Sequence, residues 1–411
     1  MVHRLRARFG RAASLPRAFW FLWAGTIVNR LGGFVVPFLT LYLTGQRGLP
    51  VAQAALMVSL FGAGSFTANL IGGELADRLG RRPVLMLSLF AAPVAMLALG
   101  SARDIPLIAA TTLILGFFTD LYRPAVSAAV ADLVPAEDRP RAYGYLYWAI
   151  NLGAAIAPAL AGWIASRNYT LLFLGDALTT ALFGVLVLWG VSETRPAGPT
   201  RGPRMATRRR LASLKDEPLL LLFAALALVF GTIYMQGYVT LPIDMRDHGL
   251  QADKYGLVIA LNGALIVLLG LPASNRAGRW PRFRTLAAAS LLLGVGFGLP
   301  ALPAGLGLYA LSVLIWTLGE IGGATVAPAV VADLSPADKR GLFQGVFGAA
   351  WGLSIFVGPL LGGWAIERLG AHTLWAACFA GGLLLAGGYL AMAGKAERRM
   401  RARREDAAGG S

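Results

Sequence analysis

Charged residues, cysteine and histidine are scarce in this sequence. Asp, Glu, Lys and Arg make up only 14% of the 411 residues, and the chain has one cysteine and three histidines. The single cysteine, Cys378, excludes a disulfide framework. His3, His248 and His372 lie far apart, so the sequence predicts no metal site. The pattern G-x-x-x-x-G-K-S/T is also absent, which excludes direct use of ATP through a phosphate-binding loop.

Long hydrophobic runs, by contrast, are abundant. Hydrophobic residues make up 56% of the chain, and its mean hydropathy is +0.62, more apolar than a soluble protein of this length. The runs repeatedly reach about 20 residues, the length at which a helix spans about 30 Å of hydrocarbon. We therefore predict an all-α polytopic membrane protein with twelve transmembrane helices. These are expected at 18–44, 51–74, 84–101, 106–131, 142–165, 170–191, 218–243, 255–273, 285–302, 306–332, 342–366 and 373–394.

The predicted spans form two groups of six. Residues 192–217 are rich in Pro, Gly and Arg and lack apolar periodicity, so we expect a soluble linker between bundles at 18–191 and 218–394. Residues 1–17 form a basic tail, and the run after them is too long for the core of a signal peptide. The charged tail 395–411 is expected to be disordered.

Basic residues are distributed unevenly between the predicted loops. Most of the 37 Lys and Arg residues fall in the two tails, the linker and the loops on one side of the membrane. Because basic loops favour the cytoplasm, both termini and the linker are expected there, in a multi-pass protein of the plasma or inner membrane. The net charge of +16 then reports topology, and no nucleic-acid partner is predicted.

The two groups of spans are sequence repeats. The segment 131–139, A-D-L-V-P-A-E-D-R, returns 201 residues later as A-D-L-S-P-A-D-K-R at 332–340. The correspondence continues without a gap through Pro158 and Pro359. Because each unit holds an even number of spans, the repeats are predicted to lie parallel, related by an axis along the membrane normal.

One polar stretch lies between the second and third runs. It contains Gly73, Asp77, Arg78, Gly80, Arg81 and Arg82. Gly73 is expected to allow close helix packing, and Gly80 to provide a turn in which glycine permits positive φ. Asp77 can pair with a guanidinium or with the N-terminus of the next helix.

The pattern G-x-x-x-D-R-x-G-R-R resembles the loop signature between the second and third helices of the major facilitator superfamily. This resemblance covers about residues 18–394 and implies two six-helix bundles that work by alternating access. The corresponding loop 274–284 keeps arginines but has no counterpart of Asp77, so a second gating contact there is in doubt.

A second motif lies in the fifth span. It resembles the fifth-helix signature of the family's drug/proton antiporters, with alanine at two of the glycine positions, and implies a small-residue face that packs on the other half. Ordinary helix packing is the alternative, and similar residues in the second half favour a symmetric packing role. The motif residues are Gly144, Gly153, Pro158, Gly162, Gly358, Pro359 and Gly362.

Ionisable residues inside membrane spans cost several kcal/mol and are functional candidates. The proton-coupling candidates are Glu320, Asp120, Arg30 and Arg123, whereas Asp176 is expected to be interfacial or paired. In the family fold the first and fourth helices line a central cavity, which would let Arg30 pair with Asp120. We expect Glu320 or Asp120 to exchange a proton in competition with substrate, with a fixed, non-titrating Asp120 ion pair as the alternative.

Aromatic and amide side chains are the candidates for the wall of this cavity. Such a mixed surface suits amphipathic or cationic molecules. The candidates are Asn29, Phe34, Tyr147, Asn151, Tyr234, Gln236, Asn262 and Trp316.

The function expected from this resemblance is proton-coupled efflux of small hydrophobic or amphipathic molecules, such as drugs or metabolites. The proton gradient supplies the energy, no cofactor or catalytic residue is predicted, and we expect a monomer in the lipid bilayer. A proton-coupled importer of a nutrient or peptide is one alternative, because the run 29–34 resembles the first helix of proton/peptide symporters, although their paired acidic residues are absent. A non-transporting scaffold or receptor is the other.

Overall fold

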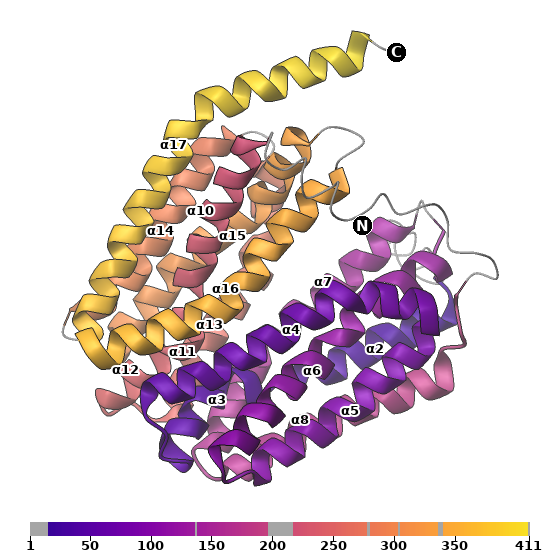
Figure 1. Ribbon diagram of the computed structural model, residues 1–411, viewed down its shortest axis with the longest axis vertical. Helices are drawn as coiled ribbons and strands as arrows, with labels where there is room; N and C mark the ends of the chain where they lie inside the picture. The colour runs from indigo at the N-terminus through magenta and orange to yellow at the C-terminus, as the bar shows by residue number, and fades with distance from the viewer. Residues whose placement is uncertain are drawn as a thin grey trace, which may run out of the picture. The chain divides into compact units, whose positions relative to one another are not determined.

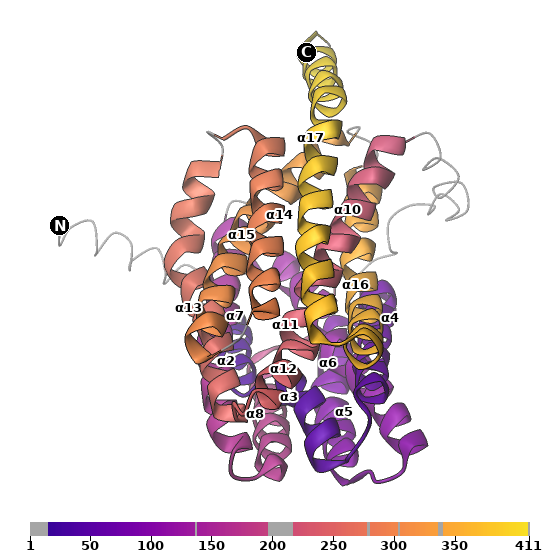
Figure 2. The ribbon, with the colours of Figure 1, turned by 90° about the vertical axis from the view of Figure 1, so that its left-hand side faces the viewer.

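The computed structural model describes residues 15–135, 138–195, 217–277, 280–302, 305–335 and 340–409. Within these residues the chain is helical and forms no strand (Figures 1 and 2). Twelve helical stretches are long and apolar enough to cross a membrane, which confirms the predicted class and number of spans. The predicted N-terminal tail and linker fall almost entirely outside the described residues.

The first six candidate spans contain eight helical elements. The first span is formed by three of them in succession, and each of the other five by one helix. They are α2 (Arg17–Leu31), α3 (Val35–Leu41), the π-helix η1 (Tyr42–Gln46), α4 (Val51–Leu79), α5 (Arg81–Ser101), α6 (Ile105–Leu133), α7 (Arg139–Ala165) and α8 (Tyr169–Gly190).

The second six spans repeat this plan. Again the leading span is interrupted, here twice. The elements are α10 (Pro218–Tyr234), α11 (Gln236–Val239), α12 (Leu241–Asp247), α13 (Ala252–Ala277), α14 (Arg282–Gly298), the short 3₁₀ helix η2 (Leu299–Ala301), α15 (Leu306–Leu334), α16 (Arg340–Leu369) and α17 (Ala371–Gly409).

The interruptions in the first and seventh spans were not predicted from the hydrophobic runs. Between α2 and α3 the chain leaves the helix, so the first N–H groups of α3 have no intrahelical acceptor. Asp176 on α8 fills this need, because its Oδ2 accepts hydrogen bonds from the backbone N–H groups of Phe34 and Val35, both at 3.0 Å. A buried carboxylate thereby stabilises the break where lipid offers no hydrogen bonds.

The chain divides into two compact units. Unit 1 comprises residues 1–36 and 60–200, and unit 2 comprises 37–59 and 201–411. This division differs from the predicted bundles because the segment 37–59 groups with unit 2.

In unit 1, α5 packs against α6 and α8, and α2 packs against α7 and α8. The contact of α4 with α6 is especially close, since a Cβ added at Gly64 would overlap the carbonyl oxygen of Leu113, and one at Gly116 would overlap that of Phe61. Only glycine permits such an approach of two helix backbones. Around it lies an apolar core that includes Phe19, Leu121 and Phe183.

In unit 2, α14 lies between α15 and α17 (Figures 1 and 2). Glycine again allows the close approach, because a Cβ at Gly294 on α14 would meet the Cα of Gly382 on α17 at 2.7 Å. The core of this unit includes Phe223, Phe283 and Tyr389.

The segment 37–59 is held in unit 2 by polar and aromatic contacts. Arg246 Nη1 donates to Thr44 Oγ1 at 2.8 Å, and the backbone N–H of Ala52 donates to Glu367 Oε2 at 2.6 Å. The rings of Phe38 and Tyr255 lie 5.2 Å apart, edge to face.

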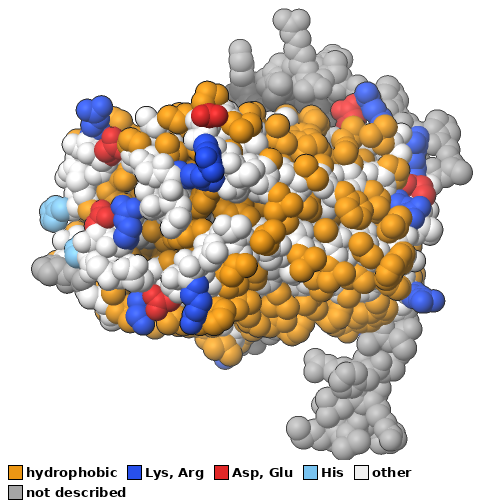
Figure 3. Space-filling view, turned by 90° about the horizontal axis from the view of Figure 1, so that it is seen from below, with side chains coloured by type: hydrophobic (Ala, Val, Ile, Leu, Met, Phe, Trp, Pro, Cys, Tyr) orange, Lys and Arg blue, Asp and Glu red, His pale blue; other side chains and the backbone are white. Residues whose placement is uncertain are grey.

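Large hydrophobic side chains remain exposed on the long helices. Trp189, Leu384 and Leu70 are 77%, 76% and 72% exposed. Hydrophobic side chains cover much of the face in Figure 3, and charged ones are scattered over its left half and along its right edge. Exposed apolar area of this extent marks a surface that contacts something other than water. A lipid-facing surface accounts for it.

The expectation of a disordered C-terminal tail is wrong for the residues that the structure describes. Helix α17 continues from the last span to Gly409. The tail from Lys395 is rich in Ala, Glu and Arg, which are strong helix formers, so the helix propagates although the hydrophobic run has ended.

Candidate functional site

The loop between α4 and α5 brings together the ends of three helices of unit 1. Arg81 Nη1 lies 3.0 Å from Asp77 Oδ1 at the end of α4, and Arg81 Nε lies 2.9 Å from Asp132 Oδ2 at the end of α6. The Arg81 side chain is only 11% exposed. Asp77 therefore pairs with a guanidinium, which was one of the two predicted arrangements, and Arg81 ties α4 to α6.

The other predicted partner of Asp77, the N-terminus of α5, is occupied by Glu193. Its carboxylate accepts from the backbone N–H of Arg81 at 2.9 Å and of Arg82 at 3.2 Å. Burial opposes the ionisation of Glu193, but four backbone N–H donors outweigh it and hold the pKa of this carboxyl below its usual range. Sequence analysis missed Glu193, since it lies 112 positions from Arg81 and no local pattern marks it.

The two glycines of this motif differ in their environment. Gly80 has φ of 107°, and an added Cβ would overlap the Glu193 carboxylate, so glycine is required here for two reasons. Gly73 was expected to bring helices together, but an added Cβ would meet nothing within 4 Å. Of the two remaining arginines, Arg82 donates to the Leu188 carbonyl on α8, 106 positions away, and the exposed Arg78 pairs with Glu74 on its own helix.

Unit 2 contains a second copy of the arginine contact. Arg282 Nη1 at the start of α14 lies 2.6 Å from Asp333 Oδ2 at the end of α15. These residues lie 201 positions after Arg81 and Asp132. The doubt about a second contact rested on the missing counterpart of Asp77. The repeat nevertheless preserves a different aspartate, because Asp333 on α15 corresponds to Asp132 on α6.

Asp120 forms a closed ion pair in unit 1. Arg123 Nε lies 2.8 Å from Asp120 Oδ1, and Ser65 donates to the other carboxylate oxygen. The predicted pair with Arg30 is absent, because Arg30 donates to the hydroxyl of Tyr122 instead. Tyr122 is two positions after Asp120 and so faces away from it on the helix. Within the described residues, Arg30 Nε is buried without a hydrogen-bond partner.

Two cavity candidates of the first span serve helix packing in unit 1. Asn29 Nδ2 donates to Thr180 Oγ1 on α8 at 2.9 Å. Phe34 is buried and packs over Gly175, where an added Cβ would lie 3.1 Å from its ring. On α7, Tyr147 is 56% exposed, whereas Asn151 is buried and donates to the carbonyl of Tyr147 at 2.8 Å.

Glu320 on α15 joins three helices of unit 2. Its Oε2 accepts from Asn262 Nδ2 on α13 at 2.7 Å, and its Oε1 accepts from the hydroxyl of Tyr234 on α10 at 3.0 Å. Asn262 also donates to Thr317 at 3.0 Å. No Lys or Arg of the described chain lies within ion-pair distance of Glu320, so this carboxylate is solvated by neutral donors alone.

The two other candidates of unit 2 do not line open space. Trp316 is fully buried and stacks on Phe297, with ring centroids 5.2 Å apart. Gln236 is buried and donates to the carbonyl of Gly358 at 2.9 Å, which joins α11 to α16. In unit 2 both side chains contribute to helix packing, and their role on the wall of a central cavity stays a prediction.

The small-residue motifs make contacts inside each unit. A Cβ at Gly153 on α7 would lie 2.7 Å from the Arg30 carbonyl carbon on α2, and one at Gly358 on α16 would lie 2.7 Å from Met235 Cβ. A Cβ at Gly362 would overlap the Gln236 amide. At Gly144 an added Cβ would meet nothing within 4 Å. These contacts agree with the alternative of ordinary helix packing, and packing of the motif against the opposite half stays a prediction. The remaining motif residues, Gly162, Pro158 and Pro359, lie within α7 and α16.

Comparison with known proteins gives the same family as the loop motif. The sequence profile of the Major Facilitator Superfamily matches residues 22–320 and 236–409. The Na⁺, Li⁺, K⁺/H⁺ antiporter of Planococcus maritimus is 24% identical over 361 residues, covering 79% of this chain and 84% of the antiporter. Multidrug resistance protein MdtH of Escherichia coli O1:K1 is 23% identical over 367 residues, covering 88% of this chain and 89% of MdtH.

The fold is also shared with solved structures. A transporter of the POT family, crystallised with 5-aminolevulinic acid, superposes with a TM-score of 0.78 at 17% sequence identity, covering 93% of this chain and 97% of that one. Twelve apolar helices in two repeats, with buried polar groups, are the architecture of a secondary membrane transporter. The chain belongs to the Major Facilitator Superfamily.

Proposed function

We propose that the protein exports small hydrophobic or amphipathic molecules in exchange for protons, and that Glu320 carries the proton. The observation that supports this role is the bonding of Glu320, which accepts from Asn262 and Tyr234 and pairs with no Lys or Arg among the residues that the structure describes. A carboxylate in an apolar bundle is costly when ionised unless it is paired. Uptake of a proton removes that cost, so occupancy by a proton and by a cationic or polar substrate can alternate.

Asp120 is the weaker candidate because its charge is already compensated. Arg123 and Ser65 together occupy both carboxylate oxygens. The Asp120 side chain is buried while that of Arg123 is half exposed. Protonation of Asp120 would break its ion pair with Arg123, so the nearby guanidinium favours the charged form of this carboxylate. We assign Asp120 to a fixed structural ion pair, which was the alternative left open by the sequence.

The names of two relatives support antiport and export. One is an antiporter of monovalent cations and protons, and the other is a multidrug resistance protein. We propose alternating access as the mechanism, with the Arg81 and Arg282 contacts as latches at the cytoplasmic rim. We also propose that both termini lie in the cytoplasm of an inner-membrane protein. The proton gradient is then the energy source, and the functional unit is a monomer that needs no cofactor.

Transport in proteoliposomes with an imposed pH gradient tests the role of Glu320. We expect Glu320→Gln to lose gradient-driven movement of ethidium, a cationic amphipathic probe, by about 100-fold while downhill exchange persists, because the neutral amide cannot release a proton. Asp120→Asn provides the comparison and should lower thermal stability. Unchanged gradient-driven transport by Glu320→Gln would overturn the proposal.

Proton-coupled import of a carboxylate-bearing nutrient or peptide is the second candidate. It is favoured by the buried Nε of Arg30, which has no acceptor within the described chain and could receive a carboxylate. The direction of the gradient that drives accumulation separates the two functions. A proton antiporter should accumulate its substrate in vesicles that are acidic inside, because protons leave as the substrate enters. A proton symporter should accumulate its substrate in vesicles whose outside medium is acidic, because protons and substrate enter together.

A further inference from the structure

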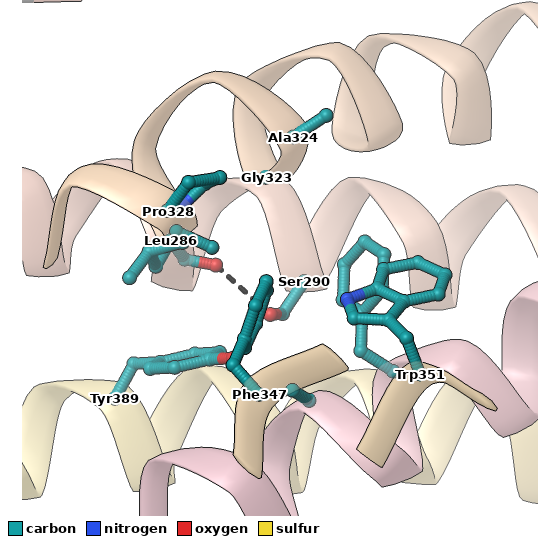
Figure 4. A pocket seen from close by; sticks show the side chains of 11 residues that line it. Leu286, Ser290, Gly323, Ala324, Pro328, Phe347, Trp351 and Tyr389 are labelled. Atoms are coloured by element: carbon teal, nitrogen blue, oxygen red, sulfur yellow. Dashed lines mark hydrogen bonds between the residues drawn. The ribbon is translucent and has the colours of Figure 1, made fainter. Parts of the chain in front are cut away.

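A cavity lies inside unit 2, among α10, α14, α15, α16 and α17. Its volume is about 230 Å³. The wall combines aromatic rings with small residues, so that the space is bounded by flat surfaces (Figure 4). The lining includes Phe230, Phe347, Trp351, Ala227, Ala327 and Gly323. No charged side chain lines the cavity, which favours a neutral occupant.

Two hydroxyl groups line this cavity, and they differ in their bonding. Ser290 donates to the Leu286 carbonyl at 2.9 Å and is thereby satisfied (Figure 4). The side chain of Tyr389 lines the cavity and is only 3% exposed, and no hydrogen bond within the described chain engages its hydroxyl. Its ring extends from α17 toward Phe347 (Figure 4). An acceptor on a ligand in the cavity would give this hydroxyl a hydrogen bond that no group of the described chain provides.

An aromatic wall connects the cavity to Glu320. The ring centroid of Trp351 lies 6.0 Å from the ring centroid of Phe230 and 6.0 Å from that of Tyr234. The hydroxyl of Tyr234 in turn donates to Glu320. A molecule in the cavity would therefore contact Trp351, which packs against a direct partner of the proposed proton carrier.

We propose that this cavity binds the apolar part of the transported molecule, a neutral group of about two fused rings with one hydrogen-bond acceptor directed at Tyr389. This inference rests on the proposed function. The size follows from volume, because an apolar protein cavity of about 150 Å³ binds benzene and the present cavity is larger. The acceptor follows from the Tyr389 hydroxyl, and the absence of charge follows from the lining.

Binding to the purified full-length protein in detergent tests the site without a gradient. The probe is tritiated 2-acetylnaphthalene, with naphthalene as the analogue that lacks an acceptor. Ala327→Leu fills the cavity from α15, and Ala227→Leu fills it from α10. Ala329→Leu adds the same side chain at an exposed position of α15 that does not line the cavity. Thermal melting of each variant verifies that it is folded.

We expect Ala327→Leu and Ala227→Leu to weaken binding of 2-acetylnaphthalene by at least about 10-fold, and Ala329→Leu to leave it within about twofold, because only the first two occupy the space of the ligand. Tyr389→Phe should weaken binding of 2-acetylnaphthalene by about 3- to 10-fold and that of naphthalene by less than about twofold, the loss expected for one hydrogen bond.

Equal binding by the wild-type protein and both cavity-filling variants would overturn the site. An equal effect of Tyr389→Phe on the two probes would overturn the role of its hydroxyl. Because binding requires no pH gradient, it can succeed while Glu320→Gln transports normally, which would reject the proton-coupling role of Glu320 alone. Conversely, loss of gradient-driven transport by Glu320→Gln without probe binding would reject only the cavity.

Discussion

Single residues at the α4–α5 turn have roles that their chemical type alone does not reveal. Gly73 and Gly80 belong to one motif, yet only Gly80 has positive φ and a neighbour, Glu193, that leaves no room for a side chain. Glu193 in turn neutralises the N-terminus of α5. The motif therefore specifies a backbone shape at one glycine and leaves the other free.

Replacement of the two glycines by alanine tests this difference. Gly80→Ala should destabilise the protein by about 1–3 kcal/mol, because it combines backbone strain with a clash against Glu193. Gly73→Ala lies inside α4 with open space around it and should be neutral or stabilising by up to about 1 kcal/mol. Thermal melting in detergent measures both. Equal destabilisation by the two changes would contradict the assignment.

At the scale of elements, each unit contains an arginine–aspartate contact between two neighbouring helices. It joins the start of α5 to the end of α6 in unit 1, and the start of α14 to the end of α15 in unit 2. The side chains of Arg81 and Asp132 are 11% and 17% exposed, and those of Arg282 and Asp333 are 31% and 27% exposed. Ion pairs lose strength with exposure to water. The first copy should thus be the stronger of the two.

Double-mutant cycles with alanine measure this ranking. We expect coupling free energies of about 1–2 kcal/mol for Arg81 with Asp132 and about 0.5–1 kcal/mol for Arg282 with Asp333. The exposed pair Arg246 and Asp247 is the control and should show less than about 0.5 kcal/mol. A coupling of zero between Arg282 and Asp333 would show that their proximity contributes nothing to stability.

The sequence predicted the elements that depend on local composition. Bilayer thickness sets the length of an apolar span, so hydrophobic runs alone located all twelve. The break before α3 escaped prediction because its stabilising carboxylate, Asp176, is 142 positions from Phe34. The packing roles of Trp316 and Gln236 were missed for a similar reason, since aromatic and amide residues suit both a core and a cavity wall. Glu320 was chosen as a candidate from the sequence because an acidic residue in an apolar run is conspicuous by itself, and its role stays a prediction.

At the scale of the whole molecule, alternating access requires the two repeats to rock against each other. The segment 37–59 belongs to the first repeat in sequence, yet it groups with unit 2 through contacts such as Thr44 with Arg246. If the repeats are the moving bodies, these contacts must separate in every transport cycle.

A thiol cross-link across this contact tests the motion. In a Cys378→Ser background, Thr44→Cys and Arg246→Cys joined by a short bifunctional reagent should reduce ethidium transport at least about 10-fold, and cleavage of the link should restore it, because the link prevents separation. Each single cysteine treated with the reagent is the control. Full transport by the cross-linked protein would mean that residues 37–59 move together with unit 2.

The carboxylate of Asp176 provides a fixed hydrogen-bond acceptor at the bend in the first span. Elsewhere, amides released from a helix are satisfied by passing water, which comes and goes as a channel wets and dries. Here the acceptor is covalently attached to α8 and cannot diffuse away. The break between α2 and α3 should therefore keep its geometry whether or not water reaches it.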